Sequence, residues 1–171
     1  MGINTKNIIL IGMPGCGKSS IGSMVSKTLQ MDFCDLDNYI EEKEQASISE
    51  LFTISEDHFR DAESRAVAEI YQKQSLIIST GGGIVTRPEN MTFLGKTGLI
   101  FYLERPIEMI LTTSDLKTRP LLAKDNTQIY TLFANRKHLY EKYCHFRIKN
   151  DQSFHTAVHH IIKIVREYKE Q

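Results

Sequence analysis

The stretch that decides the fold is Asn7-Ile-Ile-Leu-Ile-Gly-Met-Pro-Gly-Cys-Gly-Lys-Ser19, near the start of a chain of 171 residues. Its first part, Asn7 to Ile11, contains the uninterrupted aliphatic run Ile8 to Ile11 and is ended by glycine, which predicts a short strand buried on both faces. Its second part, Gly12 to Ser19, matches the phosphate-loop pattern GxxxxGK[ST] in full. Apolar residues then recur on one helical face: Ile21, Met24, Val25 and Leu29. A strand, a glycine-rich loop and a helix in this order predict a binding site for nucleotide phosphates.

Each part of this loop has a chemical task. Gly12, Gly15 and Gly17 let backbone N–H groups point at phosphate oxygens, and the helix that begins near Lys18 adds the positive end of its dipole. Lys18 supplies a mobile positive charge for the β- and γ-phosphates, and the Ser19 hydroxyl can ligate Mg²⁺. The alternative is a glycine-rich turn that matches the pattern by chance, which the strand before it and the helix after it disfavour.

Composition and charge exclude several classes of protein. The chain is 41% hydrophobic and 25% charged, which is ordinary for a globular protein and argues against disorder. Its 21 basic residues equal its 21 acidic residues, so it lacks the excess positive charge typical of proteins that bind nucleic acid or anionic membranes. A bound anion must therefore be held by local geometry. We expect one domain, a monomer, with neither nucleic acid nor membrane as a partner.

The cysteines and the apolar runs indicate a compartment. Cys16, Cys34 and Cys144 are far apart and form no CxxC pair, so the sequence encodes neither a disulfide framework nor a zinc site. The longest aliphatic run is far too short to span a membrane, and the N-terminus lacks the apolar segment of a signal peptide. We therefore expect a cytoplasmic protein. Cys16 lies inside the phosphate loop, either as an inert side chain or as a reactive thiol.

The rest of the chain repeats the pattern of a buried strand followed by a helix. Three short apolar runs predict further strands: 31–35, 76–80 and 99–103. Apolar residues at helical spacing predict three further helices: about 56–71, 129–143 and 158–168. Ser47 and Glu50 have the spacing of a capping box, and the polar segment 112–126 predicts a mobile loop. Buried strands separated by helices predict an α/β fold with a parallel sheet covered on both faces.

Asp35-Leu-Asp37 follows the second apolar run. At strand spacing both carboxylates point to one side, where two like charges are costly unless a cation or a hydroxyl group lies between them. One carboxylate near Mg²⁺ and one on a sugar-like hydroxyl would account for the pair. The alternative is a turn in which Asp37 is a helix N-cap, and the residues alone leave both interpretations open.

Three arginines are candidates for binding anions. Arg136 falls inside the apolar stripe of the helix predicted at 129–143, where a guanidinium needs a partner. That partner is an internal carboxylate, solvent reached by extending outward, or a substrate carboxylate held bidentately. Arg60 and Glu63 have the spacing of a surface pair on a helix, which by itself is the simpler interpretation. Arg119 lies in the polar loop and is a candidate for stabilising transition-state charge.

Together these residues resemble the bacterial shikimate kinases, which are P-loop enzymes similar to nucleoside monophosphate kinases. The resemblance extends from the phosphate loop to about Glu141. Beyond the loop it rests on these segments: Phe33-Cys-Asp35-Leu-Asp37, Ser47-Ile-Ser-Glu-Leu-Phe52, Phe59-Arg60-Asp-Ala-Glu63, Thr80-Gly81-Gly82-Gly83, Arg119-Pro-Leu-Leu122 and Arg136 with Leu139-Tyr140-Glu141. It implies a three-layer α/β/α fold with a five-stranded parallel sheet, in a single P-loop kinase domain over residues 1–171. Within it, a small helical substrate-binding segment would span about 37–64 and a mobile lid about 112–126.

The resemblance also implies a reaction, the transfer of the ATP γ-phosphoryl group to the 3-hydroxyl of shikimate. The products would be shikimate 3-phosphate and ADP, in the pathway to chorismate and the aromatic amino acids. Mg²⁺ would be the cofactor, with ATP as co-substrate. Three residues would be catalytic: Lys18, Asp37 and Arg119. The nucleotide phosphates would be bound by Gly15, Cys16, Gly17, Lys18, Ser19, Ser20 and Arg119. Shikimate would be bound by Asp37, Arg60, Gly82 and Arg136, and the metal by Ser19 and, through water, Asp35.

Two departures from the family's pattern concern the adenine contacts. Thr112 stands where the family usually carries an arginine, and the segment 148–153 lacks the usual proline-containing loop. The resemblance therefore assigns no adenine contact. A related small-molecule kinase, such as a gluconate kinase, is the alternative enzyme, although the arginines and Asp37 fit it less well. A nucleotide-dependent regulatory module without phosphoryl transfer is the alternative outside enzymes.

Overall fold

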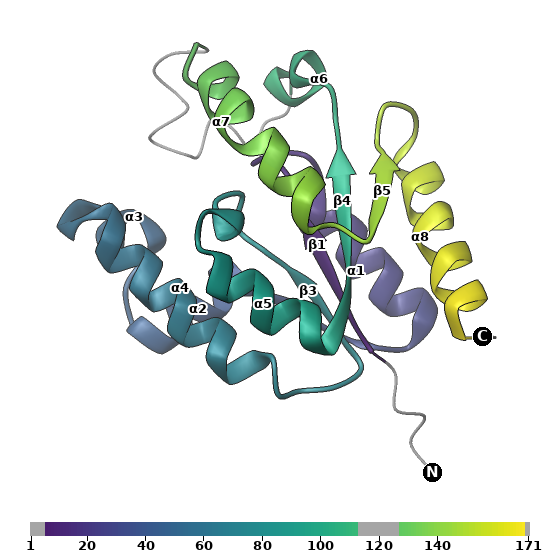
Figure 1. Cartoon of the computed structure of the whole chain (residues 1–171), viewed down its shortest axis with the longest axis horizontal. Coiled ribbons are helices and arrows are strands. Elements are labelled where there is room, and N and C mark those ends of the chain that lie inside the picture. Colours follow the sequence, from purple (N-terminus) through teal and green to yellow (C-terminus); the bar gives the residue numbers. More distant parts are fainter. Residues whose placement is uncertain (1–5, 113–126, 170–171) are drawn as a thin grey trace.

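The phosphate-loop strand lies at the centre of the sheet. The computed structural model describes residues 6–112 and 127–169, and in it β1 (Asn7–Ile11) lies between β3 (Leu76–Ser79) and β4 (Gly98–Glu104). With β2 (Asp32–Asp35) and β5 (Phe146–Lys149), they form a five-stranded sheet in the order β2-β3-β1-β4-β5, and every pairing is parallel (Figure 1). The expected parallel sheet is confirmed. Its strands all end at one edge, where ligands of open α/β sheets bind.

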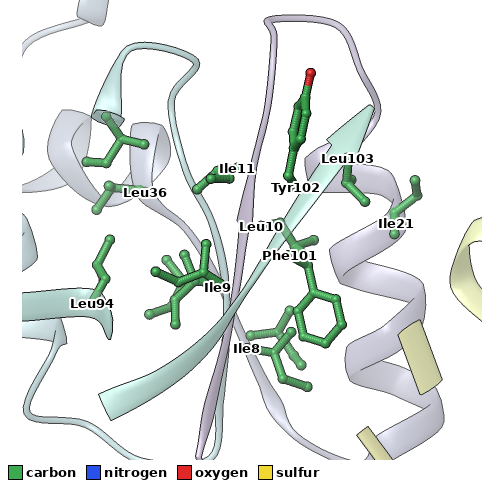
Figure 2. Packing of buried hydrophobic residues seen from close by; sticks show 14 of the residues in the cluster. Ile8, Ile9, Leu10, Ile11, Ile21, Leu36, Leu94, Phe101, Tyr102 and Leu103 are labelled. Carbon is green, nitrogen blue, oxygen red and sulfur yellow. The ribbon is translucent and has the colours of Figure 1, made fainter. Parts of the chain in front are cut away.

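The apolar run of β1 is explained by burial on both sides. Figure 2 shows Ile8 and Leu10 pointing to one side of the sheet, toward Ile21 of α1 (Lys18–Leu29), and Ile9 and Ile11 pointing to the other. All five residues of β1, including Asn7, are at most 1% exposed. A strand covered on both faces needs no polar alternation, as predicted.

Helices cover both faces of the sheet and make the expected three layers. On one face α1 packs against α8 (Phe154–Lys169), and on the other α5 (Pro88–Thr97) and α7 (Thr127–Tyr143) contact β4 (Figure 1). The remaining helical elements are α2 (Leu36–Glu44), α3 (Ile48–Ile54), α4 (Glu56–Ile70), the short 3₁₀ helix η1 (Ile84–Thr86) and α6 (Ile107–Leu111). Within residues 6–112 and 127–169, no helix combines the length and apolar character that crossing a membrane requires.

The proposed substrate-binding segment consists of α2, α3 and most of α4. The predicted capping box at the start of α3 is confirmed, because the Ser47 hydroxyl accepts from Glu50 N and the Glu50 side chain accepts from Ser47 N. Phe52 of α3 then stacks on Phe59 of α4 with ring centroids 4.4 Å apart. Residues 113–126, which hold most of the predicted lid and Arg119, lie outside the described residues, so the lid stays a prediction.

Candidate active site

The phosphate loop leaves β1 and turns into the start of α1, as predicted. Gly12 and Gly17 have φ angles of 146° and 97°, and a Cβ atom at Gly12 would lie 2.7 Å from the Leu103 carbonyl oxygen. The Lys18 side chain is buried, and its ammonium donates to the carbonyls of Gly12 (2.9 Å) and Met13 (2.8 Å). The loop therefore holds its lysine over its own backbone.

Three oxygen-bearing side chains meet beside the loop. The Ser19 hydroxyl donates to Asp35 Oδ2 at 2.5 Å and lies 3.1 Å from the Ser79 hydroxyl. Asp35 is the last residue of β2 and Ser79 the last of β3. Because the strands are parallel, both residues lie at the edge of the sheet where the phosphate loop begins. Carboxylate and hydroxyl oxygens are the ligands that Mg²⁺ prefers. Sequence reasoning missed Ser79, although a serine at the end of a buried apolar run was a usable signal.

The capping residue of α2 is Asp35, which corrects the expectation that Asp37 caps this helix. Asp35 Oδ1 accepts from the backbone N–H groups of Asp37 (3.1 Å) and Asn38 (3.4 Å), so Asp35 is the N-cap. Asp37 lies in the first turn of α2, and the strand-spacing argument for two carboxylates on one side is therefore wrong.

The triple-glycine turn after β3 joins the phosphate loop to acidic side chains. A Cβ atom at Gly81 would lie 3.1 Å from Asp37 Oδ1 and 3.2 Å from Glu63 Oε1, so both carboxylates approach this glycine. A Cβ atom at Gly82 would lie 2.6 Å from Cδ of Pro14 in the phosphate loop. The absence of side chains at this turn is what lets these groups come together.

Arg60 and Glu63 form a buried pair, so the interpretation as a surface pair is wrong. Arg60 is 6% exposed and Glu63 0%, and Arg60 Nη1 donates to Glu63 Oε2 at 2.8 Å. Burial raises the pKa of Glu63, and the Arg60 guanidinium opposes this rise. The guanidinium lies so close to the backbone of Gly83 that a Cβ atom there would clash with it. Arg60 Nε and Glu63 Oε1 are buried without a hydrogen-bond partner among the described residues.

Arg136 lies on the inner part of α7, as its place in the apolar stripe predicted. Its side chain is half-buried. Burial raises the pKa values of Glu63 and Tyr140, and the positive charge of Arg136 partly opposes this rise in both. Arg136 therefore acts on the same buried region as Arg60. Two guanidinium groups in one region are suited to a ligand that carries a carboxylate.

The end of β5 is fastened to the phosphate loop. Asn150 is 2% exposed, and its Nδ2 donates to the Cys16 carbonyl at 2.9 Å, a contact that sequence reasoning missed. The Cys16 side chain is itself fully buried, which favours the interpretation as an inert residue.

A cavity of about 380 Å³ lies where β4 and β5 end, lined in part by Arg105, Phe133 and Lys149. It includes none of the predicted site residues.

The structure thus brings the predicted residues that it describes, which do not include Arg119, to one edge of the sheet in two adjoining groups. The phosphate loop, Asp35 and Ser79 form the first group, and Asp37, Arg60 and the triple-glycine turn form the second, with Arg136 acting on it. The first group suits a polyphosphate with a divalent cation. The second suits a small acceptor with hydroxyl and carboxylate groups.

Comparisons with known proteins agree with this chemistry. The profile of a family described as shikimate kinase matches residues 14–166. A shikimate kinase of Clostridium botulinum (strain Alaska E43 / Type E3) is 44% identical over 158 residues, which are 92% of this chain and 96% of that protein. The structure of shikimate kinase from Acinetobacter baumannii in complex with shikimate has a TM-score of 0.91 at 31% identity, over 98% of this chain and 96% of that one.

A comparison with the alternative enzyme is less close. The structure of a gluconokinase from Sinorhizobium meliloti 1021 covers 99% of this chain and 96% of its own, but with a TM-score of 0.65 and 12% identity. That similarity shows a shared fold alone. The match to the shikimate kinase profile and the 44% identity to a shikimate kinase, by contrast, are similarities of sequence over nearly the whole chain. This chain belongs to the shikimate kinase family.

Proposed function

We propose that this chain transfers the γ-phosphoryl group of ATP to the 3-hydroxyl of shikimate, giving shikimate 3-phosphate and ADP. As a member of its family, the chain is an ATP-dependent kinase that acts on an alcohol. The observation that carries the finer proposal is the triple-glycine turn, where the phosphate loop, Asp37 and the buried Arg60 guanidinium meet. A small acceptor with hydroxyl groups and a carboxylate matches this set of partners.

At the nucleotide end, the chain's own groups supply the phosphate contacts. Lys18 would exchange the Gly12 and Met13 carbonyls for β- and γ-phosphate oxygens, and the backbone N–H groups of the loop would bind the rest. Ser19 and, through water, Asp35 would hold Mg²⁺, and their hydroxyl and carboxylate oxygens fit that ion. When bound, Mg²⁺ neutralises charge on the phosphate oxygens during transfer.

At the acceptor end, the proposed roles follow from charge and position. Asp37 would orient the 3-hydroxyl and accept its proton, while Arg60, Arg136 and the backbone at Gly82 would hold shikimate, with both arginines on its carboxylate. Arg119 would stabilise charge on the transferring phosphoryl group. Most of the catalysis would then come from positioning and charge stabilisation. We further propose that the chain acts on small molecules as a monomer in the cytoplasm.

The test is release of ADP from MgATP in the presence of shikimate, gluconate or no acceptor. We expect shikimate alone to raise the rate far above the blank, and Asp37→Asn to abolish that rise while MgADP binding is retained. Stimulation by gluconate instead would favour the related sugar-acid kinase. Equal rates in all three reactions would refute phosphoryl transfer to either acceptor.

A further inference from the structure

The carbonyl groups of the triple-glycine turn are all bound by donors of this chain. Those of Gly81 and Gly83 accept hydrogen bonds from η1, which directly follows the turn. That of Gly82 accepts at 2.5 Å from the hydroxyl of Tyr140, which lies in α7 on a distant part of the chain. Because the C=O and N–H groups of a trans peptide point in opposite directions, each of these bonds also fixes the direction of an N–H group. The local helix thus sets two of the peptides, and Tyr140 sets the peptide between Gly82 and Gly83.

Tyr140 is held so that its hydroxyl has little freedom. The side chain is 0% exposed, and its ring stacks on Tyr102 of β4 with centroids 5.1 Å apart. Its hydroxyl also lies 3.7 Å from the Met13 sulfur in the phosphate loop. Burial raises the pKa of Tyr140, so the hydroxyl keeps its proton and remains a donor at neutral pH.

The same residue connects the turn to the arginine of α7. Arg136 lies one helical turn before Tyr140, so a shift of α7 that breaks the bond to Gly82 also displaces Arg136. The Gly82–Gly83 peptide in turn lies under the Arg60 guanidinium. A single hydrogen bond therefore couples the positions of the two arginines that the proposed function places on the acceptor.

We infer that Tyr140 is a positioning residue of the acceptor site, which sets the triple-glycine turn and Arg136 relative to each other through its hydrogen bond to the Gly82 carbonyl. The inference rests on the proposed function. It predicts an effect on the acceptor and none on the nucleotide, although Tyr140 also lies near the phosphate loop. A purely structural tyrosine would lower stability and leave the relative affinities for the two ligands unchanged.

The test compares Tyr140→Phe with Tyr102→Phe in the full chain. Each removes one hydroxyl from the same stacked pair, but only the first removes the bond to Gly82. For Tyr140→Phe we expect the KM for shikimate to rise roughly fivefold or more, the change that a lost hydrogen bond gives, with the KM for MgATP unchanged. For Tyr102→Phe we expect both KM values to stay at the wild-type level. Replacing Tyr140 with 4-aminophenylalanine restores a donor and is expected to recover most of the shikimate affinity.

The outcomes separate the inference from the proposed function. If the wild type is active and the two variants, Tyr140→Phe and Tyr102→Phe, have the same KM for shikimate, the inference alone is overturned. If shikimate does not stimulate ADP release by the wild type, the proposed function is overturned and the inference with it. If Tyr140→Phe does not fold, amide NMR spectra of the wild type decide. The Gly82 and Gly83 resonances should shift more on addition of shikimate than on addition of MgADP, and equal or smaller shifts with shikimate would refute the inference.

Discussion

Asp35 uses its two carboxylate oxygens for two different tasks, and one substitution can separate them. Oδ1 accepts from two backbone N–H groups and caps α2, whereas Oδ2 faces the Ser19 hydroxyl. Asp35→Asn keeps an oxygen for the cap, since asparagine caps helices as well as aspartate does. It replaces the second oxygen with an NH₂ group, which can neither ligate a cation nor accept a hydrogen bond from the water bound to one. Asp35→Ala removes both tasks.

The two tasks predict effects of different kinds, on stability and on the dependence on Mg²⁺. Loss of an N-cap costs about 0.5–2 kcal/mol. At about 2–4 °C per kcal/mol for a chain of this size, Asp35→Ala should lower the Tm by roughly 1–8 °C, whereas Asp35→Asn should melt close to wild type. Both variants should lose roughly 10–100-fold in activity at limiting Mg²⁺. The measurements are thermal unfolding and Mg²⁺ titration of the shikimate-dependent rate.

A matched control removes a cap that has no link to the metal. The Ser55 hydroxyl caps α4 by accepting from His58 N at 3.0 Å. Ser55→Ala should therefore lower the Tm like Asp35→Ala and keep the wild-type dependence on Mg²⁺. The reasoning is refuted if Asp35→Asn keeps the wild-type Mg²⁺ dependence, or if it melts as low as the alanine variant.

Two further predictions concern other parts of the site, and a third concerns a cysteine in β2. Arg136→Ala should weaken shikimate binding roughly 30-fold or more, as truncation of a buried charge partner does, and leave MgATP binding intact in calorimetry. Arg119→Ala should lower kcat by roughly 10³-fold or more with little change in shikimate affinity; an equal loss of both would place Arg119 in the substrate pocket instead. Burial raises the pKa of the Cys34 thiol, so at neutral pH it holds less thiolate than an ordinary cysteine. Its alkylation, followed by mass spectrometry, should be slow at neutral pH and accelerate as the pH rises, and a rate equal to that of free cysteine would contradict this.

The parts of the fold that depend on neighbouring residues were predictable. The run Ile8–Ile11 and the loop after it specify a buried strand and a phosphate site, because strand burial and loop geometry are local properties. The capping box at Ser47 is equally local. Asp37 shows where such reasoning stops. Whether an aspartate two residues after Asp35 belongs to the strand or to the next helix depends on which residue caps that helix, and both are good caps.

Burial of Arg60 and Glu63 was predictable in principle from helical periodicity. Glu63 lies four residues after Phe59 and three before Ala66, so it falls inside the apolar stripe of α4. The argument that singled out Arg136 therefore applied to this pair as well. Contacts between distant segments are different. Ser79 reaches Ser19, and Tyr140 reaches Gly82, only because of the strand order and the path of α7, which no local pattern encodes.

The contact between Arg60 and Gly83 limits how the acceptor site can evolve. Gly83 has a φ angle of −99°, which any amino acid can adopt, so its backbone alone would tolerate a side chain. A side chain there would instead have to displace the neighbouring Arg60 guanidinium. A mutation at position 83 therefore moves this guanidinium away from Glu63 or favours a shorter residue at position 60, and either change disturbs a proposed substrate contact. These two positions should therefore covary, and a library that varies one position at a time would miss the double substitutions able to admit a new acceptor.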